Sequence, residues 1–360
     1  MPAIRIRAAS YEDADAIRLL NARNGMGSLD TKDWREGWET YPFASEFQDI
    51  PTGWVLETEN GSVVGNLDNI HMLYEMHGRR IKGVIAAGWA VDAEHRGKSL
   101  QLMTTFFRQK GVDLWLNVSA SPAAAQILTA LKVARIPIPD YEKPSFWAVR
   151  PWAFARAALL RRSVSGAGLL AWPAGLALWA RDVCLRSGRG SLTSQVRRIR
   201  EFDERFDDFC EKLSSASGRL RAVRNRAVLE WRFRVAFRGG RAVIVVAERG
   251  AALLGYAILV GRQESDFGMN LYDVADMQAV EDDSTIIRDL LLGSIKLARE
   301  VGADAVKFAT GEPGQYATAS ALRPYSYGMP FWQQYFKASS EISSELSRAE
   351  GWDFSRFDTF

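Results

Sequence analysis

The chain has 360 residues, a length typical of two domains. Its 46 Lys and Arg residues nearly balance 43 Asp and Glu residues, and the net charge of +3 makes nucleic acid an unlikely partner. The two cysteines, Cys184 and Cys210, exclude a disulfide framework, and no spacing of Cys and His predicts a metal site. We therefore expect a protein without bound metal in a reducing compartment.

The first 150 residues alternate between the sequence patterns of strands and helices. The isoleucines and arginines near the beginning alternate as in a half-buried strand, and Ser10 can cap the helix that follows. No apolar signal segment precedes them, which predicts a cytoplasmic protein. The remaining expected elements are a hairpin at 52–74, an apolar strand at 79–92, a helix from Leu100, a strand at 112–120 and a helix opened by Pro122. This order predicts an α/β or α+β domain over residues 1–150.

The next segment, residues 151–194, differs in composition from the first 150 residues and is predicted to be a linker or an insertion. Residues 163–180 contain no charged side chain, and arginines precede and follow them. The run has about the length of a marginal transmembrane span, but Pro173 and several glycines argue against a straight spanning helix. Three interpretations stay open: a linker helix packed against a domain, a segment at a membrane surface with its arginines at headgroup level, and a true span.

Residues 195–360 predict a second domain that repeats the element order of the first. A charged segment at 194–214 is expected to be helical, and a hairpin, a long strand, a helix and a further strand follow. Each half has a hairpin, a longer strand that ends at Val91 or Val280, a turn, a helix and a strand. This shared order predicts a tandem duplication.

The turns after the two long strands differ in charge. The first contains His95, Arg96, Gly97 and Lys98, whereas the second contains only acidic residues, at 281–283. A helix N-terminus favours anions, and two cations beside a glycine strengthen that preference. We therefore expect a phosphate group to bind only in the first half.

The strand that ends at Val91, followed by "EHRGKSL" at the opening of a helix, resembles the acetyl-CoA signature of the GNAT N-acetyltransferase superfamily. The paired layout, "LEWRF" at 229–233 and the ending "GWDFSRFDTF" resemble tandem-GNAT proteins associated with exopolysaccharide and other glycan biosynthesis. The resemblance implies two tandem GNAT-like domains, each a mixed central sheet flanked by helices, of which the second is degenerate. Ser99 and Gln101 stand where the signature has small residues.

The cofactor implied by the resemblance is acetyl-CoA or another acyl-CoA. The residues expected to bind it are Trp89, Ala90, Val91, Arg96, Gly97, Lys98, Ser99 and Leu100.

The implied function is an acyl-CoA-dependent N-acyltransferase, in which an amine attacks the thioester directly. The expected acceptor is an amine of a small molecule or of an amino-sugar or glycan precursor, and residues 163–180 are a candidate contact with the inner face of a membrane. The long strand carries Val84 where several family members have a glutamate, and the helix after Pro122 has no tyrosine, so the catalytic residues stay undetermined. The remaining polar candidates are Asp68, His71, Glu75 and Tyr141.

Two alternative functions stay open. One is a non-catalytic pseudo-acetyltransferase or acyl-CoA-binding regulator, which the missing base and tyrosine favour. The other is an aminoacyl-tRNA-dependent transferase, against which the low net charge and the absence of a coiled-coil insertion argue.

Overall fold

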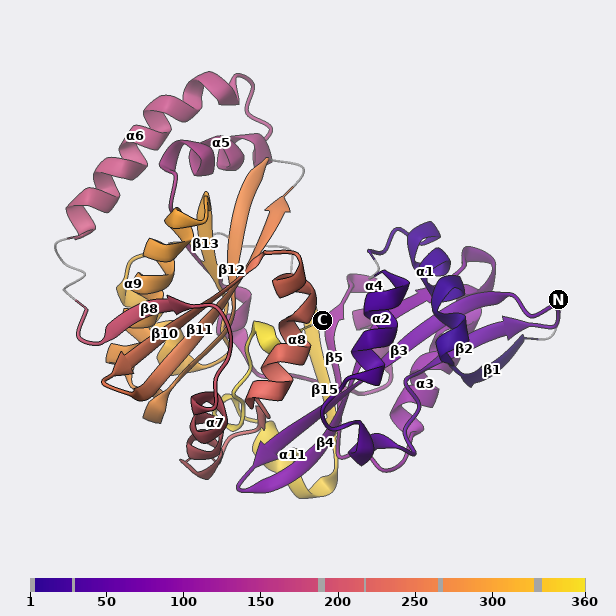
Figure 1. Ribbon diagram of the computed structural model, residues 1–360. Coiled ribbons are helices and arrows are strands. Elements are labelled where there is room, and N and C mark those ends of the chain that lie inside the picture. Colours follow the sequence, from indigo (N-terminus) through magenta and orange to yellow (C-terminus); the bar gives the residue numbers. More distant parts are fainter. Residues whose placement is uncertain are drawn as a thin grey trace.

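Two lobes, each built on one β-sheet, make up the protein (Figure 1). The computed structural model describes residues 4–27, 30–186, 192–216, 218–264, 268–326 and 332–359. Both sheets combine parallel and antiparallel strand pairs, and helices flank both of them. The predicted fold class, with two mixed central sheets flanked by helices, is confirmed.

The first sheet has the strand order β1-β2-β3-β4-β5-β15-β6, and the short strand β9 pairs with β3. Its side chains alternate between two packed faces. Val55 of β2 packs with Ile17 and Leu20 of helix α1, whereas Trp54 packs with Phe106 of helix α3. The elements of this part of the chain are β1 (Ile4–Ala8), α1 (Ala14–Arg23), α2 (Thr31–Glu39), β2 (Gly53–Thr58), β3 (Val63–Met76), β4 (Arg79–Val91), α3 (Ser99–Arg108), β5 (Leu114–Ala120), α4 (Pro122–Ala130) and β6 (Ala134–Arg135).

The second sheet has the order β14-β7-β13-β12-β11-β10-β8. Helix α9 covers one face through apolar residues such as Ile287, Leu290 and Leu291, and α7 and α8 pack on β11 and β10. The remaining elements are β7 (Ser145–Ala148), α5 (Pro151–Arg161), α6 (Ala167–Arg186), β8 (Gln195–Ile199), α7 (Arg205–Ala216), β9 (Arg221–Ala222), α8 (Arg226–Arg238), β10 (Ala242–Arg249), β11 (Ala252–Glu264), β12 (Met269–Ala279), α9 (Ser284–Glu300), β13 (Ala305–Phe308), α10 (Pro313–Ala321), β14 (Tyr325–Ser326), β15 (Gln333–Ala338) and α11 (Ser340–Leu346).

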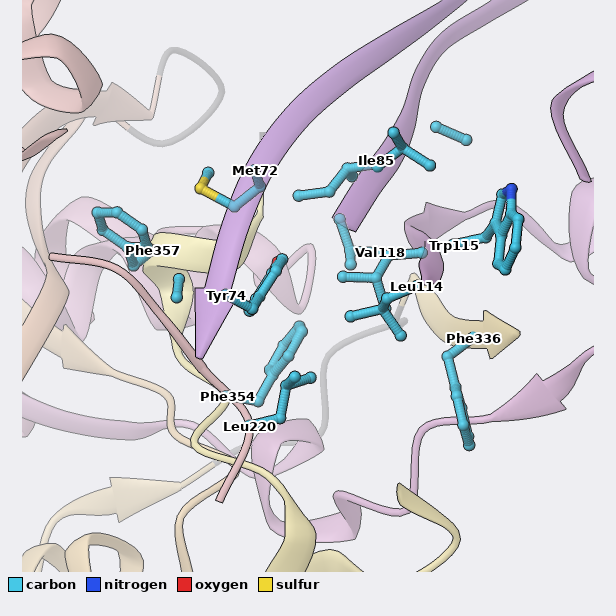
Figure 2. Close-up of a cluster of buried hydrophobic side chains, with 14 of the residues drawn as sticks. Met72, Tyr74, Ile85, Leu114, Trp115, Val118, Leu220, Phe336, Phe354 and Phe357 are labelled. Carbon is cyan, nitrogen blue, oxygen red and sulfur yellow. The ribbon is translucent and has the colours of Figure 1, made fainter. Parts of the chain in front are cut away.

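The two sheets exchange strands. Strand β7 pairs with β13 and β14 in the second sheet, and β15 returns from the second half to pair with β5 and β6 in the first. Figure 2 shows Phe336, Phe354 and Phe357, all near the end of the chain, beside side chains from β3, β4 and β5. The lobes share a hydrophobic core, and the domain limits at residues 150 and 195 stay a prediction.

The predicted linker is a helical hairpin, α5 and α6, which is inserted between strands β7 and β8 of the second sheet, and residues 162–166 form its turn. Residues 187–191 of the predicted linker, including Arg189, lie outside the described residues. The helix expected over 194–214 is only partly present, because residues 195–199 pair with β10 as an edge strand. The helix α7 starts at Arg205.

Candidate active site

The first sheet opens in its middle, where β4 and β5 diverge. Their parallel pairing joins only Gly83, Val84 and Ile85 to residues 114–116, although β4 continues to Val91 and β5 to Ala120. Beyond Ile85, this fully described stretch of β4 has no strand partner on its β5 side. Backbone polar groups of β4 that face β5 there have no strand partner and are available to a ligand, although the carbonyl oxygen of Gly88 accepts from Nδ2 of Asn66 at 3.2 Å.

A β-bulge in β4 shapes this opening. Asn66 of β3 pairs with Ala90 and Asp68 pairs with Ala87, so Gly88 and Trp89 are opposed by a single residue. Gly88 has a φ of +55°, and a Cβ atom at this position would lie 2.3 Å from Oδ2 of Asp68. Only glycine therefore allows the bulge to approach the Asp68 carboxyl this closely.

Asp68 is a buried acid with its pKa raised. Its Oδ1 accepts a hydrogen bond from Nδ2 of Asn66 at 3.1 Å, and the Trp34 side chain donates another. Burial raises the pKa of Asp68 to about 6, although the hydrogen bonds from Asn66 and Trp34 act to lower it. At neutral pH this carboxylate is charged, and its pKa lies close enough to 7 for it to accept a proton efficiently.

Asp68 lies on the wall of a cavity of about 410 Å³. The first half contributes Ala87 and Gly88 of the bulge and Ser119 of the diverging strand β5. Other parts of the wall are formed by α1, α2 and, from the second half, α8. Side chains of these three helices that line the cavity include Asn21, Trp34, Trp38, Trp231, Arg232 and Arg234. The cavity therefore joins the opening in the sheet to the junction between the lobes.

Helix α8 is held against α2 by polar contacts. Nε1 of Trp231 donates to the carbonyl oxygen of Gly37 at 2.7 Å, and Nη2 of Arg234 donates to that of Asp33 at 2.7 Å. Arg238 forms ion pairs with Asp33 and Glu36 at 2.5 and 2.6 Å. The second half thus supplies a fixed wall for a site centred on the first.

Asn21 of α1 adds a second acceptor to the cavity. It is buried, and its Oδ1 has no hydrogen-bond partner among the described residues. A buried acceptor without a partner is costly unless a ligand or water satisfies it. Together with the Asp68 carboxylate, Asn21 suits a substrate group that carries N–H donors, such as an amine.

The turn after β4 presents the two predicted cations. Residues Ala93–Lys98 form a 3-10 turn that leads directly into α3, and Arg96 and Gly97 are exposed. Within the described parts of the chain, neither Arg96 nor Lys98 has a hydrogen bond or an ion pair, and no side chain caps the N-terminus of α3. Space is open around Gly97, and Gln101, which departs from the family signature, has an exposed side chain.

The other residues predicted to bind acyl-CoA lie on the two sides of this turn. Ala90 and Val91 are buried and pair with Asn66 and Gly65, whereas Ser99 and Leu100 begin α3, and Leu100 is 48% exposed. Trp89 is partly buried, and its Nε1 has no partner among the described residues.

The residues present fit an acyl-CoA. Two strands that diverge can admit a narrow chain between them, and the buried Nε1 of Trp89 and Oδ1 of Asn117, one on each strand, lack protein partners in the described structure. The cationic turn and the uncapped helix N-terminus that follow β4 suit a diphosphate. These features occur in succession along β4 and α3.

The three other candidate catalytic residues lie outside the lining of the cavity, in packed or strand-paired positions. His71 is buried, stacks on Phe47 with ring centroids 4.7 Å apart, and has its pKa lowered to about 4 by burial. Glu75 lies near the far end of β3, in register with Arg80. Tyr141 packs edge-on against Phe354, with centroids 5.0 Å apart, and burial raises its pKa. Of the four candidates, Asp68 lines the cavity of about 410 Å³, and His71, Glu75 and Tyr141 do not.

In the second half, the region beyond the paired parts of β12 and β13 is filled by other segments of the protein itself. Gly311 donates from its backbone N–H to Phe354, and Gln315 donates to the carbonyl oxygen of Met277. Arg219 pairs with Asp282 in the acidic turn, and Asp283 caps α9 by accepting from the backbone of Thr285. The helix N-terminus there is already satisfied, so this half offers no comparable anion site within the described residues.

A buried ionic cluster also occupies the second half. Arg224 forms ion pairs with Asp276 at 3.2 Å and with Asp358 at 3.5 Å, and Arg221 pairs with Asp353. The arginines that precede α8 therefore hold the C-terminal segment in place. They do not form a solvated basic surface.

Sequence reasoning missed the aromatic walls of the cavity. Helix α2 carries Trp34 and Trp38 one turn apart, and Asp30 caps it, so a cap followed by an amphipathic segment was the available signal. Nothing local in the sequence indicates that Trp231 lies beside α2, because the two segments are about two hundred residues apart.

Comparison with known proteins supports the fold but gives no close relative. No sequence profile of a known family matches the chain, and no curated protein matches it. Several solved structures are similar over most of both chains. A GCN5-related N-acetyltransferase from Anabaena variabilis has a TM-score of 0.56 and 11% identity, covering 93% of this chain and 73% of its own.

A GCN5-related N-acetyltransferase from Kribbella flavida gives a TM-score of 0.57 at 15% identity, with 96% of this chain and 73% of that one covered. N-myristoyltransferase from Saccharomyces cerevisiae, solved with bound myristoyl-CoA, gives 0.59 at 10% identity, with 94% and 79% covered. Identities this low establish the fold alone. The chain has the fold of the GCN5-related N-acetyltransferases, the GNAT fold.

Proposed function

We propose that the protein is an acyl-CoA-dependent N-acyltransferase whose site lies in the first half. The observation that carries this proposal is the juxtaposition of Asp68 with the bulge at Gly88, where the sheet opens beside a cavity. An amine in the cavity would lie next to both a base and the strand that borders the acyl-CoA site. The similarity in fold to acyltransferases supports this proposal.

In the proposed reaction, acyl-CoA supplies a thioester whose acyl group passes to an amine. The turn with Arg96 and Lys98 and the N-terminus of α3 would hold the diphosphate. Free backbone N–H groups of β4 near the bulge would polarise the thioester carbonyl. The C–S bond breaks as the C–N bond forms, and the proton of the attacking amine passes to the Asp68 carboxylate. CoA leaves as a thiolate and takes up one proton, returned from Asp68 directly or through water, so that CoA is released as its thiol and the carboxylate is restored.

The acceptor is proposed to be a small molecule or a glycan precursor with a primary amine, such as an amino sugar. Trp34, Trp38 and Trp231 offer aromatic faces on which a sugar ring can pack. Arg232 and Arg234 lie on the same wall, where their guanidinium groups donate to backbone carbonyl oxygens and so fix the shape of the acceptor site. The link to exopolysaccharide synthesis rests on the sequence resemblance.

Release of CoA thiol, measured with acetyl-CoA and a panel of amines that includes amino sugars, tests this function. The wild-type protein is expected to turn over at least one amine, and Asp68→Asn to lower kcat/KM by about 10²–10⁴-fold. Glu75→Gln is the matched control, because it makes the same chemical change on the same strand, and it should leave turnover unaltered.

Two results would contradict the proposal. Binding of acyl-CoA without turnover of any amine would favour the non-catalytic alternative. Turnover that is unaffected by Asp68→Asn would remove Asp68 from the mechanism.

A further inference from the structure

The outward face of helix α6 carries an apolar stripe that nothing in the described structure covers. Its side chains repeat every three or four residues along one face of the helix. They are Leu169, Trp172, Leu176, Trp179 and Val183, hereafter the outer stripe, and the first three are 83%, 72% and 65% exposed. Trp152 of α5 extends the patch, because its ring stacks on that of Trp172 with centroids 6.4 Å apart.

The opposite face of α6 is already packed. A Cβ atom on Gly175 would lie 2.8 Å from Cα of Trp152, so α5 and α6 cross closely at this glycine. Ala171 is buried, and Leu178 packs against the cluster that contains Phe154. Figure 1 shows α6 along the outer edge of the second lobe, with α5 between it and the sheet. The outer stripe is therefore a second face with no role in this packing.

The hairpin is strongly basic. Residues 150–189 contain seven arginines and a single acid, Asp182. Arg156 and Arg162 are exposed, whereas Asp182 is drawn into contacts with Arg181 and the Tyr325 hydroxyl. Between residues 168 and 184, the exposed side chains are all apolar or cysteine. An apolar face flanked by arginines is complementary to a surface with an apolar interior and anionic groups at its exterior.

We propose that α6 docks flat on an anionic phospholipid bilayer, with the outer stripe in the interfacial region. Leucine and tryptophan are the residues that favour this depth, and exposed arginines such as Arg156 and Arg162 would meet the lipid phosphates. No helix among the described residues is both long and apolar enough to cross a membrane, so docking is parallel to the surface. The protein would then be peripheral to the inner face of a membrane, one of the locations expected from the sequence.

Vesicle sedimentation of the full chain tests this docking. The protein is expected to sediment with vesicles of equal parts phosphatidylglycerol and phosphatidylcholine, and much less with phosphatidylcholine alone or at high salt. The triple variant Trp172→Gln, Leu176→Gln and Trp179→Gln is expected to bind at least about ten-fold more weakly. Leu19→Gln on α1 is the matched control, since Leu19 is 54% exposed but lies on the other lobe, and it should bind like the wild type.

A fluorescent label that senses polarity gives a second measurement. Cys184 is exposed beside the outer stripe, whereas burial raises the pKa of the Cys210 thiol, so the label should react selectively at Cys184. Its emission is expected to shift to the blue when anionic vesicles are added. An unchanged thermal shift with acetyl-CoA in the triple variant would show that its fold and acyl-CoA binding are intact.

Three outcomes would overturn the docking without touching the proposed function. They are a wild-type protein that stays in solution with anionic vesicles, vesicle binding that survives the triple substitution, and association of the chain with itself through the outer stripe in place of vesicle binding. A failure of acetyl-CoA binding in the wild type would instead concern the proposed function alone.

Discussion

Replacing Asp68 by asparagine is predicted to stabilise the protein at neutral pH while it removes activity. Burial moves the pKa of this carboxyl from 3.8 to about 6, so between these values the folded state binds more protons than the unfolded state. The free energy of unfolding therefore falls as the pH rises through this window. At pH 7 the shift corresponds to roughly 3 kcal/mol of destabilisation.

Asparagine avoids this cost but changes one hydrogen bond. It can still accept from Nδ2 of Asn66, whereas the Trp34 side chain, which only donates, would face an amide in place of a carboxylate oxygen. A lost hydrogen bond costs about 1 kcal/mol, which leaves a net gain of roughly 2 kcal/mol at pH 7. At about pH 4.5 most of the burial penalty is absent in the wild type, and the two proteins should be nearly equal in stability.

Denaturant unfolding of both proteins at the two pH values measures this difference. Glu75→Gln serves as the control, because it makes the same chemical change on the same strand away from the cavity. If Asp68→Asn were less stable than the wild type at pH 7, the raised pKa and the assignment of a buried, unpaired carboxylate would both be refuted. The activity of the wild type should also rise with pH around about 6, as the base loses its proton.

Three further substitutions probe the fold around the site. Gly88→Ala is expected to lower the free energy of unfolding by about 1–3 kcal/mol and to impair turnover, because φ is +55° and the new Cβ would displace Asp68. Thermal unfolding measures the first effect and the thiol assay the second. Arg224→Met should destabilise by about 3–5 kcal/mol, since Asp276 and the neighbouring carboxylates would lose their buried counter-ion, and a smaller loss would argue against the cluster. Trp231→Phe removes the hydrogen bond to α2 and is expected to lower the free energy of unfolding by about 1 kcal/mol, which appears as a small drop in Tm. An unchanged Tm would show that this contact is absent in solution.

Local patterns in the sequence predicted most of the strands and helices. The capping box of Ser10 and Asp13, the hairpin of β2 and β3 and the periodic helix α9 all depend on side chains close in sequence, and all three are present. The exchange of β7 and β15 between the sheets was not predicted. Such pairing depends on contacts between segments that are distant in sequence, and local sequence patterns carry no information about these contacts.

The same distinction applies to the candidate site. The cationic turn was predicted because strand, glycine, cations and helix are consecutive in the chain. Asp68 appeared only as one of four polar candidates, because its burial and its approach to Gly88 exist only in the folded sheet. The cavity was not predicted, since its walls combine α2 with α8 from the other half.

The proposed function depends on binding of acyl-CoA by the first half, at the turn after β4. Isothermal titration of acetyl-CoA into the wild type and into the double variant Arg96→Glu and Lys98→Glu tests it most directly. Both side chains lack partners in the described structure, so the variant should fold normally. We expect saturable heat for the wild type and affinity at least about ten-fold weaker for the variant, since two attractive charges become repulsive. Equal affinity in the two proteins, or no heat in the wild type, would contradict it.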